Sequence, residues 1–484
     1  MSKKVKPKIA PAFGKEEKLY LGKAMLLIVG IYVFQDIIYD SLKLFAFFLP
    51  IVFILYLWFK SIQSGDRFRD LLKEQITLMP IPYAEGGKKL FIPKATILLV
   101  LTNILIFYFF MILSTLRDLE FMAANLSFLP DKITWWNILV SPISSMFLHA
   151  DWKHLWGNMA FLWAFGPTVE ERLGAGKFVF LYLATGILGK LITIIVFKLF
   201  LGEIYSSIGA SGAISGIMGI FMIRCFFKKL VIPIPIFGLI SFKLRINSLL
   251  PLGFFFLKDL NGGFRVLAGS NSKIGYWVHV GSMVAGMLIA ARLKLQRDAA
   301  EESYTEAGIG AIDRRVYGES GEKQLLNAMA INPKNEAALL GMARIKAVTR
   351  KPEGREYFQE AINLALRSDP KRAAEIYQEY FQVYNRMLEP SLQYRLARIF
   401  HSQGNFEGAA RSLEMIVAEP TANDATREQA FSQLVSILAE KGLIEAAQFR
   451  CRQFGEAFPQ SPFLKRAQEI SSKDSDGQLK CEKD

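Results

Sequence analysis

Long apolar segments and short polar breaks alternate along the first three-fifths of the chain, up to about residue 293. A helix needs about 20 mostly apolar residues to cross a bilayer. Five segments approach or reach that length and predict membrane-spanning helices: Ala95–Leu113, Ile143–Phe165, Phe178–Leu201, Ile208–Phe227 and Trp277–Leu293. A sixth stretch, Asn247–Leu257, is short, rich in phenylalanine and close to prolines, so its pattern alone does not establish a span.

An earlier apolar stretch runs from Ala24 to Phe59 and is interrupted by Gln35, Asp36 and Asp40. This polar break predicts a helical hairpin of two further spans. The hairpin, the lysine-rich segment before it and the basic loop after it make up a predicted first region, residues 1–92.

Lysine and arginine are unevenly distributed around these segments, and cytoplasmic loops of membrane proteins are enriched in both. A count of eight spans places both termini and every strongly basic segment on the cytoplasmic side. These segments are the N-terminus, the loop after the hairpin, the loop with Lys228, Lys229, Lys243 and Arg245, and the segment Arg292–Arg297. We therefore expect a multi-pass membrane protein, located in a bacterial inner membrane.

The composition is basic, with a formal net charge of +14 over 484 residues. Nucleic-acid binding is disfavoured, because the basic residues concentrate beside the predicted spans, where the lipid bilayer with its anionic headgroups attracts them. The three cysteines are scattered at Cys225, Cys451 and Cys481, so we expect no disulfide, no metal site and no cofactor. The lysine-rich start shows no cleavable signal peptide.

Charged, alanine-rich patterns replace the apolar segments after Arg297. We expect a linker over residues 297–319, a soluble α-helical repeat domain over residues 320–472, and a disordered tail over residues 473–484. His401 stands alone in this region and is expected to be a surface residue at a helix end.

A repeat is visible in the second half of this domain. An apolar helix, a glycine turn and a helix that starts with paired alanines occur twice, with the turns at Gly404 and Gly442, 38 residues apart. The pattern resembles degenerate tetratricopeptide repeats, which implies a peptide-binding surface and a cytoplasmic protein partner. The alternative is an appendage for stability or oligomerisation.

Two polar residues open apolar segments of the membrane region. Ser211 lies in Gly209–Gly212, and His279 ends the run Tyr276–His279. The eight-span count places both just inside the outer face, at one depth. A serine nucleophile needs an adjacent base, and an ionisable side chain within a span suggests function. A packing serine and an interior histidine are the alternative for each residue alone, but their pairing favours chemistry.

A third polar feature, His149–Asn158, enters an apolar segment at the same face. His154 and Asn158 are four residues apart, so a helix places them on one face. Two donors on one face suit an oxyanion hole; ordinary polar residues at a helix start are the alternative. Asp151 is the predicted N-cap, which leaves His149 in the preceding loop.

Together these motifs resemble the rhomboid intramembrane serine proteases over about residues 93–294. Four motifs in the same order carry the resemblance: His149, His154 and Asn158 at the family spacing, Glu170–Gly174 as Glu-x-Arg-Leu-Gly, Gly209–Gly212 as Gly-x-Ser-Gly, and His279 followed by small residues up to Gly286. The resemblance implies a six-helix protease core over residues 93–296, in which Asn247–Leu257 is the remaining span.

The resemblance also implies a role for each motif. Ser211 and His279 would form a catalytic dyad. The other implied site residues are His154 and Asn158, which with the Ser211 backbone N–H would bind the oxyanion, His149 in support, and Gly209 beside the nucleophile.

Three positions depart from the family pattern. Ser282 and Val278 stand where the family commonly has glycine and alanine, and Ser215 replaces a common aromatic residue. Ser282 is still small enough for a close helix approach together with Gly286.

The expected fold is therefore all-α: a polytopic membrane helix bundle, with an N-terminal hairpin and a six-helix core, followed by the soluble repeat domain. The expected function is an intramembrane serine endopeptidase that cleaves transmembrane segments of other proteins near the outer face. A non-catalytic rhomboid-like protein that binds membrane helices, and a membrane-anchored repeat scaffold, are the alternatives. The retained serine and histidine favour the protease.

Overall fold

The computed structural model describes residues 15–33, 49–64, 67, 69–70, 76–77, 82–85, 91–110, 127, 134–201, 207–237, 240–270, 272, 274–314, 319–348 and 351–471. The turn of the predicted hairpin, with Gln35, Asp36 and Asp40, lies outside these residues, as do Cys481 and the predicted tail. The chain divides into two compact units between Ala300 and Glu301, inside the predicted linker. The structure is mostly helical (79%).

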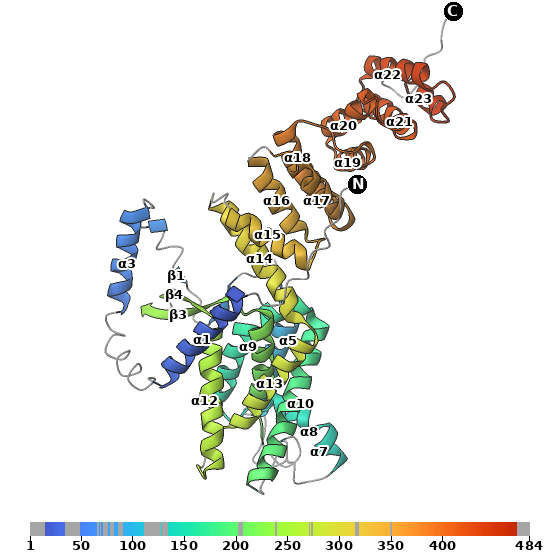
Figure 1. Ribbon diagram of the computed structural model, residues 1–484. Helices are drawn as coiled ribbons and strands as arrows, with labels where there is room; N and C mark the ends of the chain where they lie inside the picture. The colour runs from blue at the N-terminus through green and yellow to red at the C-terminus, as the bar shows by residue number, and fades with distance from the viewer. Residues whose placement is uncertain are drawn as a thin grey trace, which may run out of the picture. The chain divides into compact units, whose positions relative to one another are not determined.

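The central helix of the first unit, α11 (Ser211–Arg224), packs against α9, α10 and α13. Figure 1 shows α9, α10, α12 and α13 gathered in one bundle. Most of α11 is buried, including Ile217 and Phe221, which explains why this helix is apolar on all sides. The other helices are α1 (Lys15–Val33), α3 (Leu49–Ser64), α5 (Lys94–Tyr108), α7 (Trp135–Leu139), α8 (Ser141–Ser144), the 3-10 helix η2 (Ser145–Phe147), α9 (Trp152–Leu173), α10 (Ala175–Phe200), α12 (Leu249–Leu267) and α13 (Tyr276–Arg292).

Glycines bring the backbones of α11 and α13 into direct contact. A Cβ on Gly219 would overlap with the carbonyl group of Met283, and one on Gly286 with the carbonyl group of Gly216. Membrane helices associate closely through small residues of this kind. The glycines therefore fix the distance between the helix that carries the serine and the helix that carries the histidine.

The motif Glu170–Gly174 at the end of α9 has a structural role. Glu170, only 2% exposed, accepts hydrogen bonds from the backbone N–H groups of Ala95 (2.8 Å) and Thr96 (2.7 Å) and from the Thr96 hydroxyl (2.7 Å). The first N–H groups of a helix have no partner within it, and a carboxylate is favourable at that end. Glu170 of α9 therefore caps and anchors the start of α5.

The all-α expectation is wrong for one part of the first unit. The residues predicted as a basic loop form β3 (Lys229–Phe237) and β4 (Ile240–Asn247), which pair in a four-stranded sheet of order β1-β4-β3-β2 with β1 (Ile76–Thr77) and β2 (Tyr83–Ala84). Leu230 and Val231 of β3 are buried, while an ion pair joins Arg245 to Glu85.

Two prolines of β3 explain why its sequence suggested a loop. Proline cannot donate to a strand ladder and occurs mainly at edges. Pro233 and Pro235 face β4 through Lys243 and Ser241, whereas β2 pairs only with Leu230 and Val231. Both prolines therefore lie where β3 has no second partner strand among the described residues.

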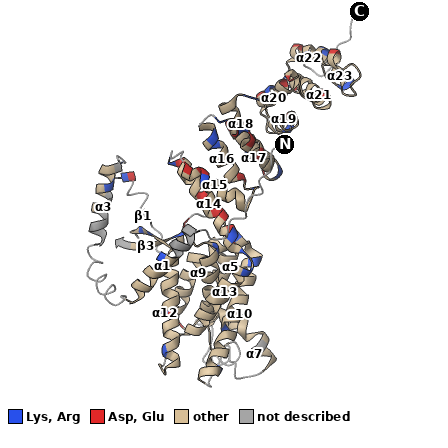
Figure 2. Ribbon diagram, viewed as in Figure 1, with Lys and Arg blue, Asp and Glu red and all other residues tan. Residues whose placement is uncertain are grey.

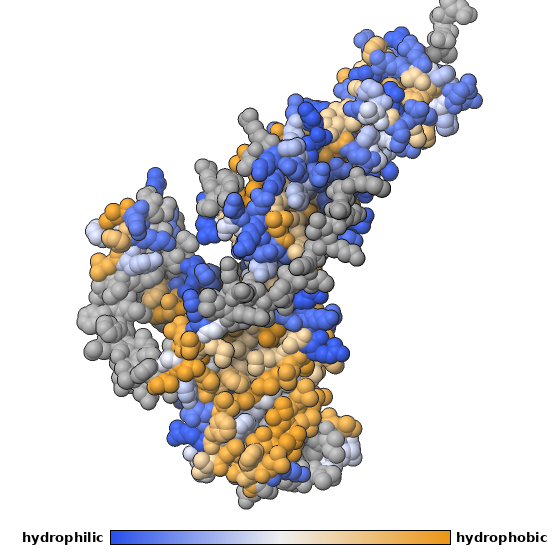
Figure 3. Space-filling model, viewed as in Figure 1, coloured by the Kyte–Doolittle hydropathy of each residue, from blue (hydrophilic) through white to orange (hydrophobic). Residues whose placement is uncertain are grey.

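Large apolar side chains are exposed on the outside of the helices. Leu98 and Leu105 of α5 are 63% and 67% exposed, and Phe180 and Leu199 of α10 are 69% and 73% exposed. Figure 3 shows a continuous hydrophobic surface over the helices of this unit. Soluble proteins rarely expose apolar patches of this extent, so the surface supports a membrane location.

Helix length alone gives a smaller count of spans than the sequence predicted. Among the described residues, α10 is the one helix that is by itself long and apolar enough to cross a membrane, and α13 with α14 (Leu295–Asp313) would add a second if this bent pair is one span. The apolar helices α5 and α11 are shorter. The count of eight spans stays a prediction.

The second unit consists of helices that carry far more charge than those of the first unit (Figure 2). After α14, which begins at the end of the first unit and replaces the predicted linker by a helix, they are α15 (Glu319–Ile331), α16 (Glu336–Val348), α17 (Gly354–Ser368), α18 (Pro370–Tyr384), α19 (Pro390–Ser402), α20 (Phe406–Ala418), α21 (Asp424–Glu440), α22 (Ile444–Ala457) and α23 (Leu464–Ser471). Gly404 and Gly442 adopt φ of +76° and +71° in the turns before α20 and α22.

Candidate active site

The start of α9 carries the first group of predicted site residues. The Asp151 carboxylate accepts the backbone N–H of His154 at 2.8 Å, so Asp151 is the N-cap that the sequence predicted. His149 lies in the loop before the helix, and its ring contacts that of His154 with centroids 5.1 Å apart. Asn158 follows one turn later and is 7% exposed, with a buried side-chain nitrogen that meets no partner among the described residues.

Gly209 lies directly beside the side chains of His154 and Asn158. A Cβ on Gly209 would lie 2.8 Å from His154 Nε2 and 3.7 Å from Asn158 Nδ2. The φ of Gly209 is +116°, a backbone conformation that favours glycine. Both features require glycine here, and they bring His154 and Asn158 to the turn that precedes Ser211.

A buried lysine fixes this turn from the other side. The Gly209 N–H donates to the carbonyl oxygen of Ser145 at 2.8 Å. Lys190 of α10, only 3% exposed, donates to the carbonyl oxygen of Pro142 at 2.8 Å and to the Ser145 hydroxyl. The segment that holds Gly209 is therefore braced against α10, a contact that no local sequence pattern indicated.

Ser211 and His279 are brought together from the first turns of α11 and α13. The distance between Ser211 Oγ and His279 Nε2 is 2.8 Å. Ser211 is the first residue of α11, where backbone N–H groups have no partner within the helix and the helix dipole favours negative charge. The arrangement therefore offers a hydroxyl next to a base, with N–H donors beside it.

The two unusual residues of the histidine helix pack against glycines. Val278 lies 2.6 Å from the position that a Cβ on Gly212 would occupy, and the Ser282 hydroxyl fills the space beside Gly189 of α10. Both side chains are thus accommodated by missing Cβ atoms on neighbouring helices. The serine and the histidine still meet.

One residue of this site was missed by the sequence reasoning. Asp259 of α12 is 4% exposed, and its Oδ2 lies 2.7 Å from His279 Nδ1. The predicted fifth span ended at Leu257 and left Asp259 in an outer loop, whereas α12 continues to Leu267. The available signal was a carboxylate two residues beyond the end of a predicted span, on the side of the membrane where His279 was expected.

Comparison with known proteins shows which family the part of the chain that carries this site resembles. A family described as Rhomboid domain matches residues 133–296. These residues form a rhomboid domain. It runs from α7 to α13 and contains all the predicted site residues as well as Asp259.

Named relatives are similar to parts of this chain. Rhomboid protease GluP of Bacillus subtilis (strain 168) is 29% identical over 242 residues, 49% of this chain and 42% of that protein. Putative rhomboid protease YdcA of the same organism is 35% identical over 95 residues, 20% of this chain and 44% of the relative. Rhomboid protein 1, mitochondrial, of Saccharomyces cerevisiae is 41% identical over 83 residues, 17% of this chain and 24% of the relative. The chain spans less than half the length of these relatives.

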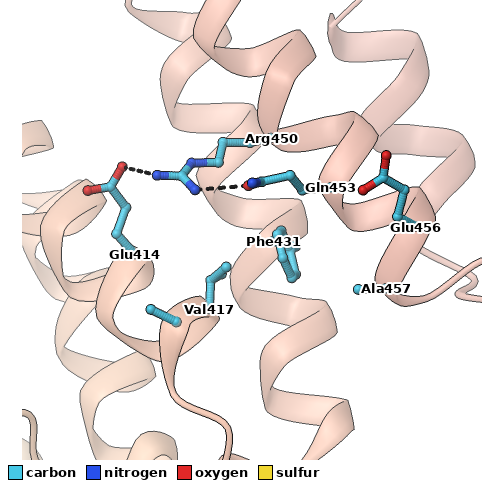
Figure 4. Close-up of a pocket in the computed structure, with 8 residues that line it drawn as sticks. Glu414, Val417, Phe431, Arg450, Gln453, Glu456 and Ala457 are labelled. Carbon is cyan, nitrogen blue, oxygen red and sulfur yellow. Dashed lines mark hydrogen bonds and ion pairs between the residues drawn. The ribbon is translucent and has the colours of Figure 1, made fainter.

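A second site lies outside the rhomboid domain. A cavity of about 640 Å³ opens between α20, α21 and α22. Arg450 crosses it between the Glu414 carboxylate (3.0 Å) and the Gln453 side-chain oxygen (2.9 Å), as Figure 4 shows. Its remaining lining residues are Val417, Ala418, Phe431, Glu456 and Ala457. This lining contains no serine, histidine or cysteine.

Metal-binding side chains are not gathered elsewhere in the described parts of the chain: no group of three or more His, Cys, Asp or Glu residues is placed to hold an ion. Cys225 and Cys451 are buried free thiols. His401 lies in the last turn of α19, partly exposed, where its Nε2 pairs with Glu440 Oε2 at 2.8 Å, so the predicted surface position at a helix end is confirmed.

Proposed function

We propose that this chain is a rhomboid-type intramembrane serine endopeptidase. The observation that carries the proposal is the 2.8 Å distance between Ser211 Oγ and His279 Nε2, within the range for a nucleophile and its base. The match of residues 133–296 to the rhomboid domain supports it, as does the likeness to a protein named Rhomboid protease GluP.

The proposed reaction is acyl transfer through Ser211. His279 Nε2 takes the proton of the Ser211 hydroxyl while Oγ forms a bond to the scissile carbonyl carbon, and the negative charge moves to the carbonyl oxygen. His279 then gives the proton to the leaving amine nitrogen as the C–N bond breaks. A water molecule then gives a proton to the same nitrogen as its oxygen bonds to the acyl carbon; the bond between that carbon and Ser211 Oγ breaks, and His279 returns the proton to Oγ.

Donors for the oxyanion are proposed on two helices. His154 Nε2 and Asn158 Nδ2 both lie within 4 Å of the position that a Cβ on Gly209 would occupy, and the Ser211 N–H lies at the positive end of α11. The buried Asn158 nitrogen meets no partner among the described residues, as expected of a donor kept for a ligand. Such donors act strongly because the site is largely shielded from water.

Substrates are proposed to be transmembrane segments of other proteins. The exposed apolar surface of α5 and α10 supports a bilayer as the surroundings of the site. Carbonyl groups of an intact helix are hydrogen-bonded internally, so a substrate must unwind locally before Ser211 can attack. Cleavage near the outer face, with both termini in the cytoplasm, follows from the basic loops.

A binding role is proposed for the second unit. Turn glycines 38 residues apart precede α20 and α22, which supports tetratricopeptide-like repeats, and the cavity beside Arg450 offers polar and apolar contacts. A cytoplasmic protein, or the cytoplasmic tail of a substrate, is the proposed partner. A bacterial inner membrane remains the proposed location.

Cleavage of defined substrates tests the proposed function. The full-length protein in detergent is incubated with a panel of proteins that each have a single transmembrane segment, beside the Ser211→Ala variant. We expect the wild-type protein to cut at least one substrate within or next to its apolar segment. A wild-type protein that binds these substrates and cuts none would favour the non-catalytic membrane-helix binder.

A further inference from the structure

Asp259 gives the serine–histidine pair a third member. Its Oδ2 lies 2.7 Å from His279 Nδ1, on the opposite side of the imidazole from Ser211. The side chains of His279 and Asp259 are 12% and 5% exposed, so the contact is shielded from water. We propose that Asp259 is a positioning residue that selects the reactive tautomer of His279; this rests on the proposed function.

The chemistry of the two groups determines which tautomer results. An ionised carboxylate only accepts hydrogen bonds, while a neutral imidazole donates from one nitrogen and accepts at the other. Contact with Asp259 therefore places the proton on Nδ1 and leaves the lone pair on Nε2. Nε2 is the nitrogen that faces Ser211 Oγ, so His279 can accept the serine proton there.

Packing between α12 and α13 holds this contact in place. A Cβ on Gly262 or Gly263 would lie 2.7 Å or 2.8 Å from the rings of Tyr276 and Trp277, respectively. The Trp277 ring N–H also donates to the carbonyl oxygen of Gly263 at 3.1 Å. These glycines let the start of α13 press against α12.

Residues four apart on α12 line the side that faces the histidine. Asp259 precedes Gly263 by one turn, and Phe255 precedes Asp259 by another turn. The Phe255 ring stacks on that of His279 at 6.1 Å with an interplanar angle of 29°. His279 is thus held by Phe255 on its face and by Asp259 and Ser211 on its two nitrogens.

Proton transfer to His279 adds a second effect. When Nε2 takes the Ser211 proton, the ring becomes positively charged next to a shielded carboxylate, and the two opposite charges attract. Asp259 itself gives and takes no proton. Its removal therefore slows the chemical steps, without removing a contact to the substrate.

A purely structural role of Asp259 predicts a different result. If Asp259 served only as a buried polar group that needs a donor, replacing it would lower stability and leave the turnover of folded enzyme unchanged. The test must therefore separate kcat from KM and from thermal stability.

Asp259→Asn in the full-length protein provides that test, because the side chain keeps its shape and loses its charge. We expect kcat to fall about 100-fold or more, as in serine proteases whose triad carboxylate is changed to an amide, while KM and Tm stay close to wild type. The rate of fluorophosphonate labelling of Ser211 should fall in parallel. Lys258→Gln, an exposed neighbouring charge on the same helix, is the matched control and should retain wild-type kcat.

A folded Asp259→Asn variant with kcat within about threefold of wild type would overturn the proposal. If this variant does not fold, the folded Asp259→Glu and Asp259→Ala variants decide: a higher kcat for Glu supports a carboxylate that positions His279, and equal kcat values reject it. Failure of the proposed function has another signature, because Ser211→Ala would then cut as well as wild type or no variant would cut at all.

Discussion

Each of the two units contains a histidine paired with a carboxylate at almost the same distance. His279 and Asp259 in the rhomboid domain are 2.7 Å apart, and His401 and Glu440 in the second unit are 2.8 Å apart. The first pair has side chains 12% and 5% exposed, and the second 29% and 50%. The other ring nitrogen of His279, Nε2, faces Ser211 Oγ. His401 instead contacts the Glu440 carboxylate through its Nε2 and packs against Phe406.

The difference shows that a histidine paired with a carboxylate forms a candidate active site only where the pair is shielded from water and a nucleophile lies beside the histidine. Exposed ion pairs contribute little because water screens them, and the described side-chain contacts of His401 are with Glu440 and Phe406, neither of which carries a hydroxyl or thiol group. Shielding from water strengthens the contact of Asp259, and Ser211 gives the other nitrogen of His279 a reactive partner. The proposed chemistry is therefore assigned to the rhomboid domain.

The largest expected effect is the loss of the nucleophile or the base. Ser211→Ala and His279→Ala should each abolish cleavage of a single-span substrate, and the double variant should be no worse, because the two residues act as a unit. His401→Ala, the matched change in the second unit, should retain wild-type kcat. Cleavage by the Ser211→Ala variant, or loss of cleavage in the His401→Ala variant, would contradict the assignment of the chemistry to the rhomboid domain.

A smaller loss is expected from the oxyanion donors. His154→Ala and Asn158→Ala should each lower kcat by roughly 10- to 1000-fold, the range for removing one such donor, with little change in KM. Lys153→Ala, an exposed neighbour on α9, serves as the control. A loss confined to KM would reassign these residues to substrate binding.

Glycine also has different roles in the two units. In the rhomboid domain, Gly219 and Gly286 stand where helix backbones touch and a Cβ would overlap with a carbonyl group. In the second unit, Gly404 and Gly442 stand in turns with positive φ and open space around them. Lipid gives helices no hydrophobic reason to associate, so close packing through small residues replaces it, whereas the second unit buries aromatic side chains such as Phe431 and Phe454.

Alanine substitutions make this contrast measurable. Gly286→Ala should push α11 and α13 apart, with a loss of about 1–3 kcal/mol from overpacking and about 100-fold in activity from misplacing Ser211 against His279. Gly404→Ala should cost about 1 kcal/mol from its backbone conformation and leave cleavage unchanged. Tm and kcat are measured for both.

Gly176→Ala on α10 is the control, because a Cβ there meets nothing within 4 Å. This variant should change neither Tm nor kcat. Equal effects of Gly286→Ala and Gly176→Ala would contradict the packing account.

The sequence predicted much of the site because its residues occur at helix starts with clear local signals. Asp151 was found as an N-cap, and the four-residue spacing of His154 and Asn158 put both beside Gly209. The close approach of Ser211 and His279, however, depends on packing between helices that are distant in sequence. No local pattern reports that distance.

Two features could not be derived from local patterns. The β3–β4 hairpin contains Pro233 and Pro235, which suggest a loop unless the strand is known to be an edge at that point. Asp259 lies in α12 between Lys258 and Asn261, and because of these polar residues the predicted span ended before the helix does. A polar residue within a span is tolerated when a partner satisfies it, and that partner, His279, lies 20 residues away.

The smallest effect is expected from removing the second unit. Leu295 and Ala299 of α14 are buried, so a chain that ends after Asp313 keeps this packing, whereas one that ends near Gln296 loses part of it. The longer of the two should cut a model substrate in detergent within about threefold of the full-length rate, since no proposed catalytic group is lost. In sealed vesicles, added protease should digest the second unit only from the cytoplasmic face; digestion from the outer face would reject the proposed topology.

The central claim is that Ser211 is a nucleophile activated by His279. Full-length protein in detergent is treated with a fluorophosphonate, digested and mapped by mass spectrometry. We predict a single adduct on Ser211, absent from the His279→Ala variant and retained in the His401→Ala variant. An unmodified Ser211 in folded wild-type protein, or equal labelling in the His279→Ala variant, would contradict the account.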